Sequence, residues 1–184
     1  YDFDDAIYLP NVSRANRFIG PFKCYWKVAS VCRWSRRVSV CNPHLAQWAS
    51  AHNADVRLIP TTVDTSYHRS NRTSRPGGGP MVIGWTGSQS TLRYLEVIRD
   101  ALCSLRRRRE FEFRVICDVD PGFPDLPGYR FVPWRIGTEI QDLDELDIGL
   151  MPVPKEDLAN GKVGFKAIQY SAMGIVPVVS DVGS

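Results

Sequence analysis

The sequence lacks several features by which a protein class is usually recognised. No apolar run approaches the ~20 residues that cross a bilayer, and no charged and then apolar signal segment opens the chain. The five cysteines are scattered, with no Cys-x-x-Cys or Cys/His pair: Cys24, Cys32, Cys41, Cys103 and Cys117. They indicate neither a disulfide framework nor a zinc site, and they favour a reducing compartment. We expect a cytoplasmic protein, and peripheral contact with a membrane is left open.

Charge of one sign is also scarce, because the formal net charge of the 184 residues is only +3. The densest basic run, residues 106–109, stands where an amphipathic helix is expected to end, and cations there interact favourably with the helix dipole. No aromatic residues are interleaved with this run, as a nucleic-acid-binding surface would require. A nucleic-acid partner is therefore not expected.

The sequence does contain a clear alternation of short apolar runs with longer stretches of helical periodicity. This is the pattern of strand–helix units that build a parallel sheet. We predict an α/β protein with a Rossmann-like, mainly parallel sheet and part of a second Rossmann-like domain. Because Tyr1 already resembles a domain interior and the chain closes on a strand pattern, we expect a fragment of a longer domain pair.

Residues 1–63 are predicted to be the remnant of an N-terminal, acceptor-side domain. Helices are expected at residues 24–36 and 43–52, and strands at 38–41 and 56–59. Asn42 followed by Pro43 suits a helix start, with Asn as N-cap and Pro at the first helical position. Residues 64–80 are polar and rich in Gly and Pro, which predicts an exposed linker.

Residues 81–184 are predicted to form the C-terminal domain, with its strands in one sheet. The expected strands are residues 81–85, 111–117, 129–132, 147–151 and 176–180, the last of them buried. The expected helices are residues 90–108, 139–146 and 163–173. In open parallel sheets a ligand binds beyond the carboxyl ends of the strands, so the loops at that edge are the first candidates for a site.

One such loop contains Gly84, Thr86, Gly87 and Ser88, between a strand and a long helix. Its glycines allow a tight turn, and its hydroxyls and the helix-start N–H groups can bind phosphate oxygens. It is neither a Walker loop nor a complete Gly-x-Gly-x-x-Gly motif. A capped helix start explains the same residues equally well.

The second candidate is residues 147–180, where a strand and a Pro-containing loop lead into a helix with two lysines. Lys162 and Lys166 are four residues apart, so a helix covering both would carry them on one face. Two cations at a helix start oppose the dipole and repel each other, unless an anion such as a diphosphate lies there. Two solvated lysines are the alternative.

At these residues the sequence resembles the retaining glycosyltransferases of family 4, also called glycosyltransferase group 1. The similarity rests on IGWTGS at residues 83–88, DIGLMP at 147–152, the two lysines, QYSAMG at 169–174 and PVVS at 177–180. It covers most of residues 81–183. Upstream, residues 2–6, 40–42 and 59–64 resemble the end of an acceptor domain and the crossover into a donor domain.

The resemblance implies the two-domain GT-B fold, a nucleotide-sugar donor, retention of anomeric configuration, and neither an obligatory metal nor a cofactor. It leaves the acceptor unidentified, whether a saccharide, a lipid-linked molecule or another compound. Lys162 and Lys166 are the expected catalytic residues, because negative charge grows on the leaving diphosphate as the glycosidic bond breaks.

The expected donor-binding residues follow from the same resemblance. Val163, Gly164 and Phe165 would offer backbone N–H groups to the diphosphate, and Gln169 stands in the place of the glutamate that usually holds the ribose. The full expected set is Gly84, Thr86, Gly87, Ser88, Trp134, Val163, Gly164, Phe165, Gln169 and Tyr170.

The sequence departs from the family at Gly161, which stands where the first glutamate of the usual E-x7-E pair contacts the transferred sugar. A second class of function therefore has to be considered, a non-catalytic module that binds a nucleotide-sugar or a partner through the same fold.

Other residues allow other interpretations. The carboxylates of residues 2–5 could bind magnesium, as in haloacid-dehalogenase-like phosphatases or metal-dependent glycosyltransferases. The downstream partners of the phosphatase motif are missing. Trp85 and Trp134 could stack a nucleobase, although core or rim packing is the commoner role, and Trp134 is the preferred candidate. The histidines His44, His52 and His68 show no ligand spacing, and helix packing or exposure is expected for them.

Overall fold

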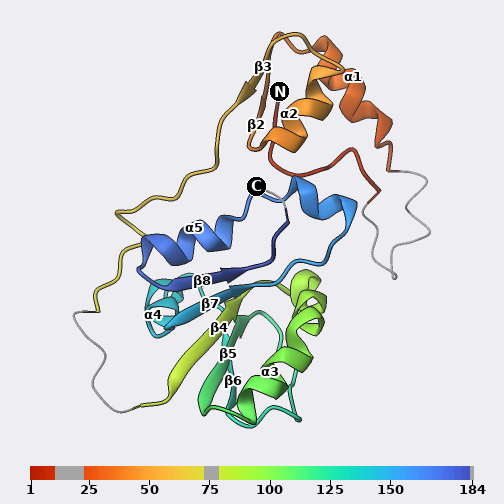
Figure 1. Cartoon of the computed structure of the whole chain (residues 1–184). Helices are drawn as coiled ribbons and strands as arrows, with labels where there is room; N and C mark the ends of the chain where they lie inside the picture. The colour runs from red at the N-terminus through yellow and green to blue at the C-terminus, as the bar shows by residue number, and fades with distance from the viewer. Residues whose placement is uncertain (11–22, 73–78, 183–184) are drawn as a thin grey trace. The chain divides into compact units, whose positions relative to one another are not determined.

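The computed structural model describes residues 1–10, 23–72 and 79–182 of the chain. They form two compact units (Figure 1). Unit 1 comprises Tyr1–Thr61, Lys155–Gly164 and Asp181–Ser184, and unit 2 comprises Thr62–Pro154 and Phe165–Ser180. The predicted domain boundaries at residues 63 and 80 remain a prediction, and the contacts add that residues 155–164 group with the N-terminal segment.

Unit 1 is built on a parallel sheet of three strands in the order β1-β2-β3. The strands are β1 (Asp2–Phe3), β2 (Val38–Val40) and β3 (Val56–Leu58). The helices are α1 (Trp26–Trp34), α2 (Pro43–Ser50) and the short 3-10 helix η3 (Asp157–Gly161). The predicted start of α2 is confirmed, because Asn42 Oδ1 accepts the N–H of Leu45 at 2.9 Å.

Unit 2 is built on five parallel strands in the order β6-β5-β4-β7-β8. They are β4 (Met81–Thr86), β5 (Phe111–Cys117), β6 (Tyr129–Pro133), β7 (Ile148–Met151) and β8 (Val176–Val179). The predicted strands therefore share one sheet, and the predicted α/β class with mainly parallel strands is confirmed.

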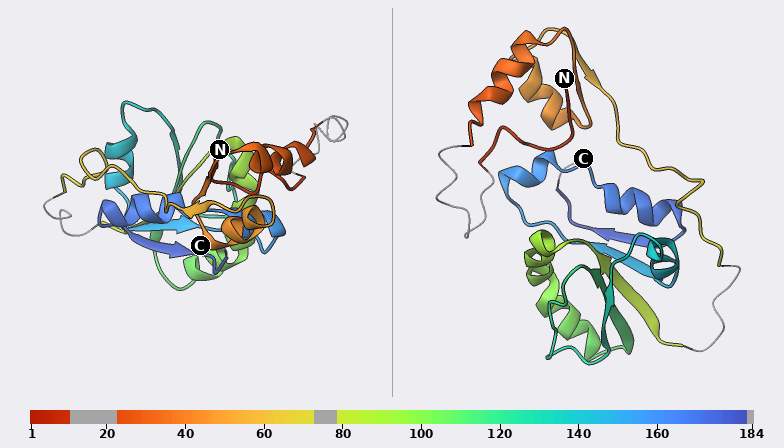
Figure 2. Two further views of the ribbon diagram at one scale, coloured as in Figure 1. Left: turned by 90° about the horizontal axis from the view of Figure 1, so that it is seen from above. Right: turned by 180° about the vertical axis from the view of Figure 1, so that it is seen from behind.

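Helices cover both faces of the five-stranded sheet (Figure 2). They are η2 (Gln89–Ile98) and α3 (Arg99–Arg106) on one face, and α4 (Glu139–Asp144) and α5 (Phe165–Ala172) on the other. Successive side chains of a strand point to opposite faces. Along β4, Ile83 and Trp85 accordingly join the core under η2 and α3, whereas Val82 joins the core under α4 and α5.

The predicted single helix over residues 90–108 is wrong. It is divided at Ile98, whose backbone (φ −113°, ψ 0°) is not helical, into the 3-10 helix η2 and the α-helix α3. The apolar side chains of η2 explain the tighter winding. Leu92, Leu95 and Ile98 are spaced by three residues and all contact the same core, and a 3-10 helix aligns residues three apart on one face.

The last strand is less buried than predicted. Val176, Val178 and Val179 of β8 are 58%, 52% and 51% exposed. The reason is position, because β8 is the edge strand of the described sheet and pairs only with β7.

The predicted linker is mostly exposed, but its first half is attached to unit 2. Ser70 donates a hydrogen bond to the carboxylate of Asp144, and Arg72 Nη1 donates to the Asp144 carbonyl at 3.1 Å. His68 is buried. Residues 73–78 of the predicted linker lie outside the described residues.

Within the ranges that the structure describes, no helix combines the length and the apolar character needed to cross a bilayer.

Tyr170 ties α5 to the sheet, and its removal offers a test of the fold. The side chain is fully buried, and its hydroxyl accepts the N–H of Thr86 at 3.2 Å and donates to the carbonyl of Leu150 at 3.4 Å. Tyr170→Phe leaves both backbone groups without that partner, so we expect a loss of about 1–3 kcal/mol in the free energy of unfolding. Urea denaturation measures it. Tyr94→Phe, the same change at a half-buried tyrosine of unit 2, is the control, and equal losses in the two variants would contradict the role of the hydroxyl.

Candidate functional site

The loop that follows β4 uses its own N–H groups inside the protein. The N–H groups of residues 86–88 donate, in chain order, to Tyr170 Oη at 3.2 Å, Ile116 O at 3.1 Å and Thr91 Oγ1 at 3.2 Å. Thr91 thereby caps the start of η2, as the capped-helix alternative predicts. The expected capture of an anion by these backbone N–H groups does not fit this arrangement, so the loop presents hydroxyls instead.

The helix with the two lysines begins later than predicted. Gly164 has φ = +69°, a left-handed conformation that other residues rarely adopt, and α5 starts at the next residue, Phe165. Lys162 therefore precedes the helix in extended backbone (φ −74°, ψ 137°). The prediction that Lys162 and Lys166 share a helix face is wrong, because the turn at Gly164 separates them.

Lys162 lies in unit 1 and pairs there with a carboxylate. Its Nζ is 2.8 Å from Asp5 Oδ2. The neighbouring Gly161 packs closely on the same segment, since a Cβ at this position would lie 2.7 Å from Ala6 Cβ and 2.8 Å from Ala6 N. The backbone of Gly161 thus closely approaches Ala6. Val163 and Gly164 also group with unit 1.

Lys166 lies in unit 2, on the first turn of α5. Its Nζ is 5.4 Å from the centroid of the Trp85 ring, which is itself buried in the core. A cation over a tryptophan face is attracted by the ring's negative potential. This contact directs Lys166 toward the carboxyl end of β4.

A pocket of about 440 Å³ opens at this carboxyl edge, entirely within unit 2. Its volume suits a small-molecule ligand. It is lined by Thr86, Gly87, Ser88, Asp118, Trp134, Glu139, Phe165, Lys166 and Gln169. Seven of these nine residues are in the set predicted from the sequence, and they come from three separate segments of the chain. The two additional residues, Asp118 and Glu139, are both acidic.

Some predicted residues do not reach this pocket. Gly84 is buried in β4, where Leu146 packs against it, and Tyr170 is fully buried. Burial raises the pKa of the Tyr170 phenol, which keeps the hydroxyl neutral and able to donate. Both residues shape the structure behind the pocket.

One wall of the pocket is a hydrogen-bonded group centred on Glu139. Its carboxylate accepts the Trp134 Nε1–H at 3.4 Å, the Gln169 amide at 3.4 Å and the Tyr67 hydroxyl at 3.2 Å. Gln169 is buried, and its Nε2 lies 2.9 Å from His68 Nε2. His68 Nδ1 lies 3.3 Å from the Asp64 carbonyl oxygen, so the ring is held from both sides.

Sequence reasoning missed His68, Asp118 and Glu139. His68 lies in the predicted linker, and Glu139 looked like an ordinary acidic residue in the first turn of a helix. The available signal was positional, because Asp118 and Glu139 follow strands β5 and β6 at the edge where the other loops meet.

Asp118 is held in its charged form. It accepts hydrogen bonds from the Cys117 thiol at 3.0 Å and from the Gln89 N–H at 2.7 Å, and these contacts lower the pKa of its carboxyl. Asp118 and Glu139 therefore make one side of the pocket acidic, and Lys166 supplies the positive charge.

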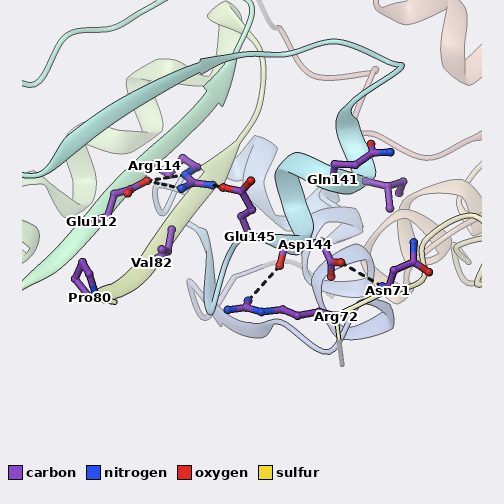
Figure 3. A pocket seen from close by; sticks show the side chains of 10 residues that line it. Asn71, Arg72, Pro80, Val82, Glu112, Arg114, Gln141, Asp144 and Glu145 are labelled. Atoms are coloured by element: carbon purple, nitrogen blue, oxygen red, sulfur yellow. Dashed lines mark hydrogen bonds and ion pairs between the residues drawn. The ribbon is translucent and has the colours of Figure 1, made fainter. Parts of the chain in front are cut away.

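A second hollow, of about 490 Å³, lies at the opposite, amino ends of β4 and β5 (Figure 3). Its cations are already bound by the protein. Arg114 is only 4% exposed and is held by Glu112 at 2.7 Å and by Glu145. Arg72 donates to the Asp144 carbonyl. This network joins the linker and α4 to the sheet and offers no uncompensated charge to a ligand.

Two of the three carboxylates of residues 2–5 are engaged within unit 1. Asp2 Oδ1 accepts the Ser39 hydroxyl at 2.5 Å, and Asp5 holds Lys162. Among the described residues, no group of three or more His, Cys, Asp or Glu side chains is arranged to hold a metal ion.

Comparison with known proteins gives little that identifies the chain. No family model matches it, and no curated protein matches it. One solved structure that matches is described as the glycotransferase of kitacinnamycin, with a TM-score of 0.37 and 15% sequence identity. The match covers 79% of this chain and 42% of that one, so the present sequence spans less than half of that protein's length.

The close approach of Gly161 to Ala6 can be tested by adding one methyl group. Gly161→Ala places a Cβ against backbone and side-chain atoms that lie less than 3.0 Å away, so we expect it to destabilise unit 1 by about 1–3 kcal/mol. Gly137→Ala is the control, because nothing lies within 4 Å of its added Cβ, and it should be neutral or slightly stabilising. Thermal unfolding of both variants measures the difference, and an undisturbed Gly161→Ala protein would contradict the described packing.

Proposed function

We propose that the chain binds a nucleoside-diphosphate sugar in the pocket at the carboxyl edge of unit 2, as the donor half of a retaining, metal-independent glycosyltransferase. The observation that carries the proposal is the meeting of residues 86–88, Trp134 and residues 165–169 around one pocket. These are the segments in which the sequence resembles the glycosyltransferases of family 4 or in which donor contacts were predicted. The location also supports the proposal, because ligands of open parallel sheets bind at this edge.

The charge distribution of the pocket suggests how the donor would lie. A diphosphate carries at least two negative charges and would be repelled by Asp118 and Glu139. It is therefore expected near Lys166 and the start of α5, where helix N–H groups point out of the first turn. The ribose and the base would then occupy the side with Trp134 and Glu139.

Trp134 and Glu139 are suited to a nucleoside. The Trp134 side chain is 41% exposed, so one ring face can stack on a base. Glu139 is already oriented by three donors, and its remaining acceptor capacity can take hydroxyl protons of the ribose. Gln169, in the place of the family's ribose-holding glutamate, would act through Glu139 by supporting its carboxylate.

In the transfer step, negative charge grows on the phosphate as the sugar becomes oxocarbenium-like. Lys166 would stabilise that charge within the pocket. A catalytic role for Lys162 stays part of the proposal, and it requires that Lys162 exchange Asp5 for the donor phosphate. The acceptor and the donor sugar are not identified by these residues.

The alternative, a non-catalytic nucleotide-sugar-binding module, is favoured by one observation. Gly161 leaves no space for the glutamate that contacts the transferred sugar in the family, because a side chain there would meet Ala6. Incubation of the complete protein with a radiolabelled nucleotide-sugar distinguishes the two functions. Transfer or hydrolysis of the sugar supports the enzyme, whereas binding without turnover supports the module.

The role of Lys166 predicts a loss of donor affinity. Lys166→Ala should weaken the binding of uridine or guanosine diphosphate about 10- to 100-fold, since a charge-assisted hydrogen bond contributes ~1.5–3 kcal/mol. Arg107→Ala removes a cation from the exposed end of α3 and should leave affinity nearly unchanged. Calorimetric titration of both variants measures the affinities. Equal affinity of Lys166→Ala and the parent chain would contradict the proposal that Lys166 binds the diphosphate.

The assignment of the nucleoside end predicts a different selectivity for Glu139. Glu139→Gln should weaken nucleoside diphosphate binding several-fold, about 1 kcal/mol for one hydrogen bond. It should leave inorganic pyrophosphate binding unchanged or slightly tighter, because the substitution removes a charge that repels phosphate. Lys166→Ala should weaken both ligands. Parallel titrations with the two probes give the comparison. A loss of pyrophosphate affinity in Glu139→Gln would show that the phosphates bind beside Glu139, which contradicts the proposed orientation.

A further inference from the structure

The outer face of α1 combines exposed tryptophans with basic residues. Trp26 and Trp34 are 67% and 85% exposed, the two most exposed tryptophans of the described chain. Lys27 and Arg33, between them in the sequence, are exposed as well. A large aromatic side chain normally gains free energy by burial, so two such rings on one helix mark a contact surface.

The geometry of α1 places these residues on one side. Val28 and Cys32 pack into the core of unit 1, which fixes the opposite face of the helix outward. Trp26 and Trp34 are eight residues apart, a little over two turns, so both project from that outer face about 12 Å apart. They can therefore reach one plane when the helix lies flat on it.

The charge of α1 and of the sequence that flanks it is of one sign. Residues 23–54 contain five basic residues and no Asp or Glu. They are Lys23, Lys27, Arg33, Arg36 and Arg37. Asp55 pairs with Arg37 at 2.9 Å, whereas Lys27, Arg33 and Arg36 are exposed on or beside α1. The complementary partner is anionic.

The arrangement favours an anionic bilayer over a nucleic acid. Tryptophan is enriched at the depth of lipid head groups, and neighbouring cations bind lipid phosphates. A flat interface admits both rings to equal depth. Single-stranded nucleic acid instead needs a basic groove that follows its backbone, and the outer face of a helix is convex.

We propose that α1 is an interfacial anchor that holds the chain on an anionic membrane surface. Trp26 and Trp34 insert among the head groups, and Lys27, Arg33 and Arg36 face the lipid phosphates. The proposal rests on α1 alone and is independent of the donor pocket in unit 2.

Sedimentation of the 184-residue chain with vesicles tests the anchor. Vesicles of phosphatidylcholine mixed with phosphatidylglycerol should bind the chain, and those of phosphatidylcholine alone should bind it far more weakly. The double variant Arg33→Gln/Arg36→Gln should bind the anionic vesicles about 30-fold more weakly. Trp26→Ala/Trp34→Ala should also lose most of the binding, because the rings supply the apolar contribution.

The matched control is Arg108→Gln/Arg109→Gln, which removes two exposed charges from the basic run after α3. It should bind as the parent chain does. Equal weakening in the two charge variants would show attraction to net charge only and would overturn the anchor. So would undiminished binding of the tryptophan variant, or tighter binding of a single-stranded oligonucleotide than of the vesicles. Circular dichroism of each variant verifies that the exposed substitutions leave the fold intact.

Discussion

The hydroxyl of Tyr170 is the contact on which the candidate site depends. It joins α5 to the last residue of β4 through the Thr86 N–H and to β7 through the Leu150 carbonyl. Because these bonds are buried, breaking them leaves backbone groups without partners and is costly. Lys166 lies one turn earlier on the same helix, so this contact also sets its position relative to the loop after β4. The pocket is a consequence of that attachment.

Periodicity predicted most of the architecture, because it reports directly on burial. The strands that were predicted to start at residues 81, 111, 147 and 176 share one sheet, and the third of them begins one residue later, at Ile148. The errors arose where local backbone conformation decided the outcome. The apolar spacing of three in η2 suited a 3-10 helix, and the left-handed Gly164 delayed the start of α5. The spacing of three and Gly164 can both be seen in the sequence. Each lies within a longer stretch of helical periodicity, which predicts a continuous α-helix.

The candidate site could be predicted in part, for a related reason. Residues 86–88 and 165–169 stand at strand and helix ends, and topology alone brings such ends to one edge. Their hydrogen bonds were not predictable, since the N–H groups of the β4 loop and the carboxylate of Glu139 are engaged by residues distant in sequence. Lys162 shows the same limit. Its ion pair with Asp5 joins positions 157 residues apart, and no local sequence pattern predicts such a pair.

Pro177 lies on the unpaired edge of β8 and affects how another strand could add to the described sheet. The N–H groups of Val176 and Ser180 point inward and donate to Asp147 and Met151, so the N–H at position 177 would face the open edge. That position is Pro177, which has no N–H to offer. An edge with exposed valines is a template for strand addition by a second molecule. Pro177 removes one donor from that template, so a strand added to β8 would form one backbone hydrogen bond fewer at this position.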